Sequence, residues 1–171
     1  IKAEVIDKVN MPSAATPPKL HHEELRLFYS KSLDNIPKEE IDKIIALPRE
    51  TLVTDLENIL KDSIRRFDEF YLKDYVDNTH DFSIHALYFL GALKAEESLP
   101  KVLNLLRISE EFTDYWYSDS IEMFFYPTLY FIGKNRLDVL KELALERNVS
   151  CWNKNKIPMA VAQIAWHEPE R

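Results

Sequence analysis

Glycine is scarce in this sequence, which has only two glycines among 171 residues. Loops that hold phosphate groups need several glycines, because their backbone must approach the anion closely or adopt positive φ. Tight β-hairpins also depend on glycine. Nucleotide-binding loops and folds built from many hairpins are therefore disfavoured. We expect one mostly helical domain that is long enough to bury a core.

Cysteine, basic clusters and long apolar runs are also scarce. The single Cys151 allows neither an internal disulfide nor a zinc site built from several cysteines. With 22 basic against 29 acidic residues and a net charge of −7, the chain lacks the clustered Lys and Arg that bind nucleic acids or anionic membranes. No stretch approaches the roughly 20 apolar residues that span a bilayer, and no apolar leader begins the chain. We expect a cytoplasmic protein that binds neither nucleic acid nor membrane and carries no metal or cofactor.

The first 20 residues differ from the remainder. Pro12, Pro17 and Pro18 stand among small residues, which predicts a linker or extended arm over 1–20. Over 21–171 apolar residues recur with the period of helices, and we expect this range to form one domain. Helices are expected near 21–33, 37–47, 48–61, 80–94, 98–108, 119–133, 136–147 and 156–166.

Two of these helices are apolar on almost all sides and share a motif. Leu-Tyr-Phe, an aliphatic residue and a glycine occur in ALYFLGAL, which contains Gly91, and in TLYFIGKN, which contains Gly133, 42 positions apart (133 − 91). Each motif precedes a polar connector and an amphipathic helix, and this period is typical of HEAT-type repeats. In a third unit, AVAQIAW, Ala165 stands in the place of the glycine. This favours close packing over positive φ as the role of the glycines.

The repetition resembles a HEAT-like solenoid. The resemblance implies an all-α fold, an α-solenoid of about three HEAT-like helix pairs with an N-terminal capping helix at 37–47. The implied pairs are 48–61 with 80–94, 98–108 with 119–133, and 136–147 with 156–166.

A narrower resemblance is to a bacterial HEAT-like family of uncharacterised function. It is carried by FTDYWYSDSIEMFFYPTLYFIG (112–133), HALYFLGALKAEESLPKVLNLLR (85–107) and AWHEPER (165–171). Members of that family often continue further, some into a cysteine-rich zinc-binding tail. The resemblance therefore implies a chain truncated at its C-terminal end, whose last helix lacks a neighbour.

Aromatic residues concentrate between positions 112 and 131, which hold nine of the 20. Most should fill gaps between helices, but Tyr115, Trp116 and Tyr117 are consecutive and cannot all point the same way. Acidic residues surround them, and aromatic rings beside carboxylates suit a basic peptide. The segment is thus either a plug between helices or a binding surface for a basic protein or peptide. The candidate contact residues are Tyr115, Trp116, Asp119, Glu122 and His85.

An enzymatic alternative rests on the pair His80-Asp81. HD-type phosphohydrolases are helical and hold divalent metals with His and Asp side chains, and His21-His22 could supply a further ligand. The opposing interpretation places His80 at the exposed start of a helix that Thr79 and Asp81 cap. Because solenoids of helix pairs usually bind other proteins, we expect a non-enzymatic binding or scaffold module and keep the hydrolase as the alternative.

Overall fold

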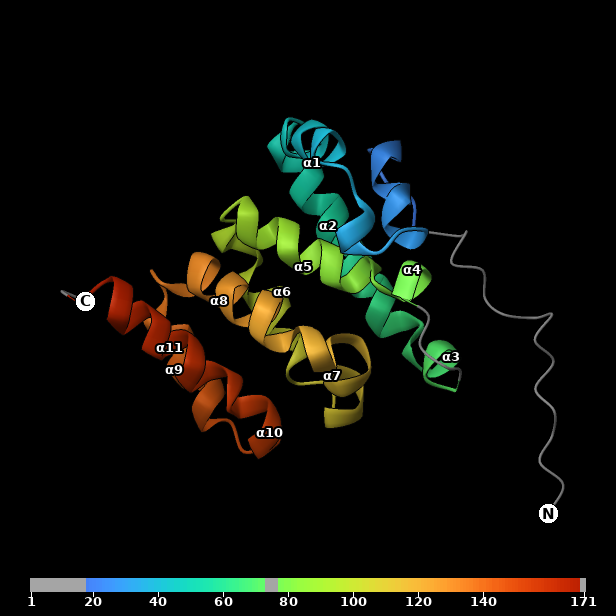
Figure 1. Cartoon of the computed structure of the whole chain (residues 1–171). Helices are drawn as coiled ribbons and strands as arrows, with labels where there is room; N and C mark the ends of the chain where they lie inside the picture. The colour runs from blue at the N-terminus through green and yellow to red at the C-terminus, as the bar shows by residue number, and fades with distance from the viewer. Residues whose placement is uncertain (1–17, 73–76, 170–171) are drawn as a thin grey trace, which may run out of the picture.

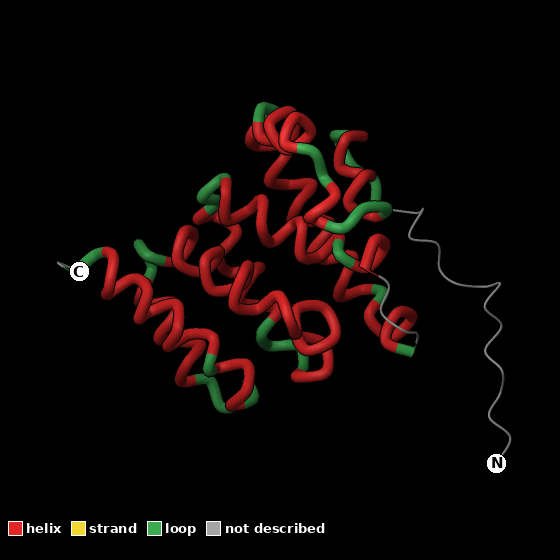
Figure 2. The backbone as a smooth tube through the Cα atoms, in the orientation of Figure 1, coloured by secondary structure: helices red, strands yellow, loops and turns green. Residues whose placement is uncertain are grey.

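A computed structural model describes residues 18–72 and 77–169, and within these ranges all regular structure is helical (Figures 1 and 2). The prediction of an all-α fold is therefore confirmed. The predicted arm at 1–20 lies outside the described residues except for its last three. The α-helices are α1 (Lys38–Ile45), α2 (Arg49–Arg65), α3 (Phe67–Tyr71), α4 (Asp77–His80), α5 (Phe82–Ala92), α6 (Leu99–Leu105), α7 (Glu110–Tyr117), α8 (Tyr126–Gly133), α9 (Leu137–Leu145), α10 (Cys151–Lys154) and α11 (Lys156–His167).

Shorter turns connect several of these helices. The 3₁₀ turns are η2 (Glu23–Tyr29), η3 (Leu33–Asn35), η4 (Glu96–Ser98) and η5 (Ser118–Ser120), and η6 (Ile121–Phe125) is a π-helical turn. None of the helices in the described part of the chain is long and apolar enough to cross a membrane.

Two predicted helices differ from the structure. The range 21–33 is not α-helical but forms η2 and η3, and its buried Leu25 and Phe28 are three residues apart, the period of a 3₁₀ turn. The range 119–133 breaks into η5, η6 and α8. Proline lacks an N–H group, so Pro127 sits in the first turn of α8, where that group has no partner in any case.

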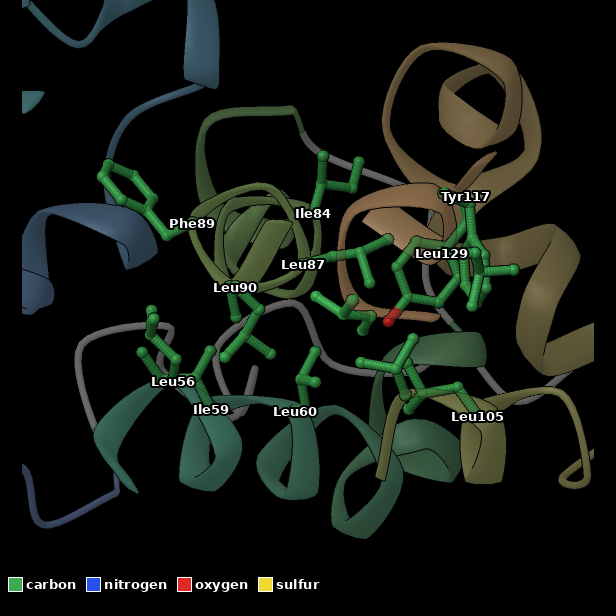
Figure 3. Packing of buried hydrophobic residues seen from close by; sticks show 14 of the residues in the cluster. Leu56, Ile59, Leu60, Ile84, Leu87, Phe89, Leu90, Leu105, Tyr117 and Leu129 are labelled. Carbon is green, nitrogen blue, oxygen red and sulfur yellow. The ribbon is translucent and has the colours of Figure 1, made fainter. Parts of the chain in front are cut away.

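Helices α2, α5, α8 and α11 pack side by side in one row. α2 packs against α5, α5 against α8, and α8 against α11, while α6 contacts α2 and α8, and α9 contacts α8 and α11 (Figure 1). One continuous core joins them, with Leu56, Ile59 and Leu60 of α2 pointing toward α5, and Leu90 of α5 pointing toward α2 (Figure 3). Helices α5 and α8 have neighbours on two sides, which explains why they are apolar around most of their circumference.

Gly91 marks the closest approach within this row. A Cβ atom there would lie 2.7 Å from Oγ1 of Thr128 and 3.2 Å from its Cα atom, so the glycine lets α5 and α8 come together. At Gly133 a Cβ atom would meet only side-chain carbons, the nearest being Cδ1 of Leu140 at 3.3 Å. Neither glycine has positive φ, so backbone conformation is not the reason for glycine at either position, and the close approach that the sequence predicted is present at Gly91. Ala165, in the place of the glycine in the third unit, is instead exposed.

Alanine substitutions at Gly91 and Gly133 should have different effects on stability. We expect Gly91→Ala to lower the free energy of unfolding by about 1–2 kcal/mol, because the clash with the Thr128 backbone outweighs the better helix propensity of alanine. Gly133→Ala should be neutral or stabilising, since the Leu140 side chain can shift. Urea unfolding of the two variants measures the difference, and equal effects would contradict the close approach at Gly91.

Two buried aspartates of α2 anchor the N-terminal segment. The carboxylate of Asp55 accepts hydrogen bonds from the backbone N–H groups of His21 (2.8 Å) and His22 (2.9 Å) and contacts Nδ1 of His21 at 2.7 Å. Asp62 accepts a hydrogen bond from the Tyr29 hydroxyl at 3.0 Å and pairs with Arg65 and Arg66. Both aspartates are almost inaccessible to solvent. They therefore fix the position of the residues that follow, including 32–34.

Candidate functional site

A pocket of about 620 Å³ lies where three distant parts of the chain meet. Residues 32–34 line one part of it, Asp81 and Ile84 line another, and residues 114–118 with Ser120, Met123 and Phe124 complete it. We call this the acidic pocket. Its size is within the range of ordinary ligand sites.

The charged side chains of the acidic pocket are all of one sign. They are Asp34, Asp81 and Asp114, and no lysine, arginine or histidine is among the lining residues that the structure describes. Asp34 and Asp114 are exposed, and neither forms an ion pair with a residue in the described ranges. Several like charges around one concave surface attract cations.

Aromatic rings and an apolar rim complete the lining. Tyr115 is half-buried, and its hydroxyl donates to the Phe70 carbonyl at 3.0 Å and lies 3.1 Å from Nδ1 of His80. These contacts hold the ring at the pocket. Phe124 is also half-buried, and Met123 is 67% exposed. A ligand in the pocket would thus meet both carboxylates and apolar surface.

Trp116 lies in the core, contrary to its predicted place on the surface. Only 1% of the residue is exposed, and its ring packs against Phe70 at 5.4 Å and Phe82 at 5.0 Å. Its indole N–H group is buried and makes no hydrogen bond. Trp116 therefore supports the pocket from behind, as an interhelical plug. The reason is that α7 turns the middle of the three consecutive aromatics inward, while Tyr115 stays at the pocket.

His85 is likewise buried rather than available to a partner. It is fully inaccessible on α5, where its ring packs against Phe28 at 4.9 Å, and neither ring nitrogen makes a hydrogen bond. Burial lowers the pKa of His85 to about 4, against a smaller opposing effect of the Phe28 backbone. The side chains of His85 and Asp81, four positions apart, do not hydrogen-bond to each other.

Asp119 and Glu122 were the remaining predicted contact residues. Their backbone belongs to η5 and η6, next to the lining residues Ser118, Ser120 and Met123. Their side chains lie outside the part of the chain that the structure describes, so their predicted role stays a prediction.

The residues proposed as metal ligands of a hydrolase, His80-Asp81 and His21-His22, do not form one site. His80 is buried beside Tyr115, so its predicted place at an exposed helix start is wrong. His21 and His22 face α2 instead, where Nε2 of His22 lies 2.8 Å from the Thr51 hydroxyl. Across the described ranges, no three His, Cys, Asp or Glu side chains gather where they could hold a metal ion.

The structure adds acidic residues that sequence reasoning did not select. Asp34 comes from a segment about 80 positions away from Asp114, and only the anchoring of that segment by α2 brings them to one pocket. Asp81 was considered as a metal ligand. The sequence did indicate that the N-terminal segment packs on the core, because it contains the large apolar residues Leu25, Phe28 and Tyr29. All three are buried in the structure.

The chain was also compared with known proteins. No protein-family model matches it, and neither the curated proteins nor the solved structures contain a match.

Proposed function

We propose that this chain is a HEAT-like binding module that captures a basic segment of another protein, without catalysis. In this proposal the helix pairs are α2 with α5, α6 with α8, and α9 with α11, and α1 with the N-terminal turns forms the cap. The row of packed helices and the close approach at Gly91 support this arrangement. Such modules present extended surfaces built for binding.

The acidic pocket is the observation that carries the proposal. Asp34 and Asp114 line it and form no ion pair with a residue in the described ranges, so a ligand that carries a positive charge suits the pocket. An arginine side chain fits best, because its planar guanidinium can bind a carboxylate through two hydrogen bonds and stack on an aromatic ring such as Tyr115. Met123 and Phe124 offer apolar contact to the residues beside that arginine.

Exposure of the carboxylates sets the strength of this binding. Asp34 and Asp114 are open to solvent, where an ion pair contributes only about 0.2–1 kcal/mol. Affinity must therefore come from several contacts at once and should weaken as salt screens the charges. A moderate, salt-sensitive affinity for arginine-containing peptides is expected.

A peptide-binding series tests the proposal. Fluorescence anisotropy of a labelled arginine-rich peptide should show binding to the wild-type chain and an affinity about two- to thirtyfold lower for Asp34→Asn/Asp114→Asn, a loss of about 0.4–2 kcal/mol for two exposed ion pairs. The matched control is Glu39→Gln/Glu142→Gln, which removes two exposed charges outside the pocket. Equal losses in both double variants, or no binding by the wild type, would contradict the proposal.

A further inference from the structure

The part of the acidic pocket that α5 forms continues into an aromatic residue. From Phe82 to Gly91 every residue of this helix is buried except Tyr88, which is half-buried. Tyr88 follows the lining residue Ile84 by four positions, one turn later on the same face of the helix. The side chain of Tyr88 therefore reaches solvent next to the pocket.

Tyr88 also contacts an aromatic residue that lines the pocket. Its ring centroid lies 6.0 Å from that of Phe124, and the two rings are nearly perpendicular, at 86°. Phe124 is half-buried as well and belongs to η6, so two separate elements meet at this point. An edge-to-face contact of this kind favours a fixed position for both rings. We call Tyr88 and Phe124 the aromatic pair.

The carboxylates and the aromatic pair lie at different levels along α5. Asp81 precedes the first residue of the helix. Asp114 is next to Tyr115, whose hydroxyl lies 3.1 Å from Nδ1 of His80, so it too belongs to the start of the helix. Tyr88 follows Asp81 by seven positions, which corresponds to about 10 Å along a helix axis. A ligand that lies along α5 would thus meet carboxylates first and aromatic rings about 10 Å further on.

We infer that the ligand of the acidic pocket carries a large apolar residue about three positions from its arginine, and that the aromatic pair binds this residue. The inference rests on the function proposed above. An extended chain advances about 3.3 Å per residue, so three residues cover the distance of about 10 Å between the two levels. The carboxylates then select the arginine, and the aromatic pair selects the apolar residue.

Continuity with the pocket decides what covers the aromatic pair. Phe124 belongs to both surfaces, so a segment whose arginine binds Asp34 or Asp114 has its neighbouring residues beside these rings. Neither carboxylate forms an ion pair within the described ranges, and charge therefore fixes the segment at that end. Because both rings are half-buried, the apolar residue is only partly covered and should raise the affinity about five- to tenfold.

Fluorescence anisotropy with two labelled peptides tests this inference. Both peptides contain two neighbouring arginines among glycines and serines. One has phenylalanine three positions before and three positions after the arginines, and the other has alanine at these two places. The wild-type chain should bind the phenylalanine peptide about five- to tenfold more tightly. Moving both phenylalanines to about ten positions from the arginines should remove this preference, since an extended chain then carries them about 33 Å away.

Substitutions in the chain show whether the aromatic pair is the cause. Tyr88→Ala should remove the preference for phenylalanine, because the pair then loses one of its rings. Leu145→Ala is the matched control, since it also shortens a solvent-facing apolar side chain, 81% exposed on α9, and should keep the preference. Circular dichroism checks that both variants are folded.

Photo-crosslinking locates the contact on the unmodified chain. A peptide with benzoylphenylalanine in place of the phenylalanines should label residues 84–88 or 123–124, as read by mass spectrometry. Equal affinities for the two peptides, or crosslinks confined to other segments, would overturn the inference. If phenylalanine has no effect while Asp34→Asn/Asp114→Asn still weakens binding, the inference fails and the proposed function stands. If neither peptide binds, both fail.

Discussion

Replacing Asp62 with alanine should lower the free energy of unfolding by about 3–5 kcal/mol. Asp62 is 2% exposed and pairs with Arg66, which is itself buried beneath the rings of Tyr29, Phe70 and Phe82. Removing the carboxylate takes the paired charge of Asp62 away from the buried Arg66 guanidinium. The Tyr29 hydroxyl also loses its acceptor. Urea unfolding monitored by circular dichroism measures this loss.

Two further variants show whether the buried charge is the cause. Asp68→Ala removes an exposed aspartate of the neighbouring helix and should change stability by no more than about 0.5 kcal/mol. Asp62→Leu/Arg66→Met removes both charges and should be more stable than Asp62→Ala, because the buried guanidinium that has lost the Asp62 carboxylate is then removed as well. A loss below about 1 kcal/mol for Asp62→Ala would contradict the anchoring role of this residue.

Mild acid should destabilise the chain through His85, by up to about 3 kcal/mol as the pH falls from 6.5 to 4. Burial lowers the pKa of His85 to about 4 in the folded state, whereas His85 has its ordinary pKa of 6.5 in the unfolded chain. The unfolded state therefore takes up a proton first as the pH falls, and stability is lost across this interval. Above pH 6.5 both states are neutral at this residue, and its contribution does not change.

The variant His85→Leu isolates this effect. Neither ring nitrogen is hydrogen-bonded, so an apolar side chain of similar size should be tolerated at neutral pH. Urea unfolding at pH values between 4 and 7 should show a smaller acid loss in the variant than in the wild type. If the free energy of unfolding falls equally with pH in the wild type and in the variant, His85 is not a buried group that is neutral in the folded state.

Helical periodicity accounts for most of what could be predicted of the fold. In the sequence, Leu52, Leu56, Ile59 and Leu60 recur at the spacing of one helical face, and all four are buried on α2, because one face of that helix meets the core. The same holds for Leu103 of α6. The glycine-bearing helices α5 and α8 are apolar on almost all sides, and each packs between two neighbouring helices, as such a composition predicts.

The candidate site was harder to predict, because it depends on contacts between distant segments. Periodicity cannot say which of three consecutive aromatics turns inward, and the packing of α7 buries Trp116 while leaving Tyr115 at the pocket. Residues 32–34 line the acidic pocket because the hydrogen bond from Tyr29 to Asp62 holds the segment that precedes them. Asp62 lies some 30 positions later, and no local sequence pattern predicts this hydrogen bond. The burial of His85 likewise depends on tertiary packing and could not be predicted from the sequence.

The central claim is that the acidic pocket holds the basic ligand, and amide chemical-shift mapping tests it most directly. A ¹⁵N-labelled sample titrated with an arginine-rich peptide should show its largest shifts at residues 32–34, at Asp81 and Ile84, and over 114–124. Shifts that are saturable and reversed by salt would agree with binding at exposed carboxylates. Saturable shifts centred on α9 and α11, or no shifts at any peptide concentration, would contradict the claim.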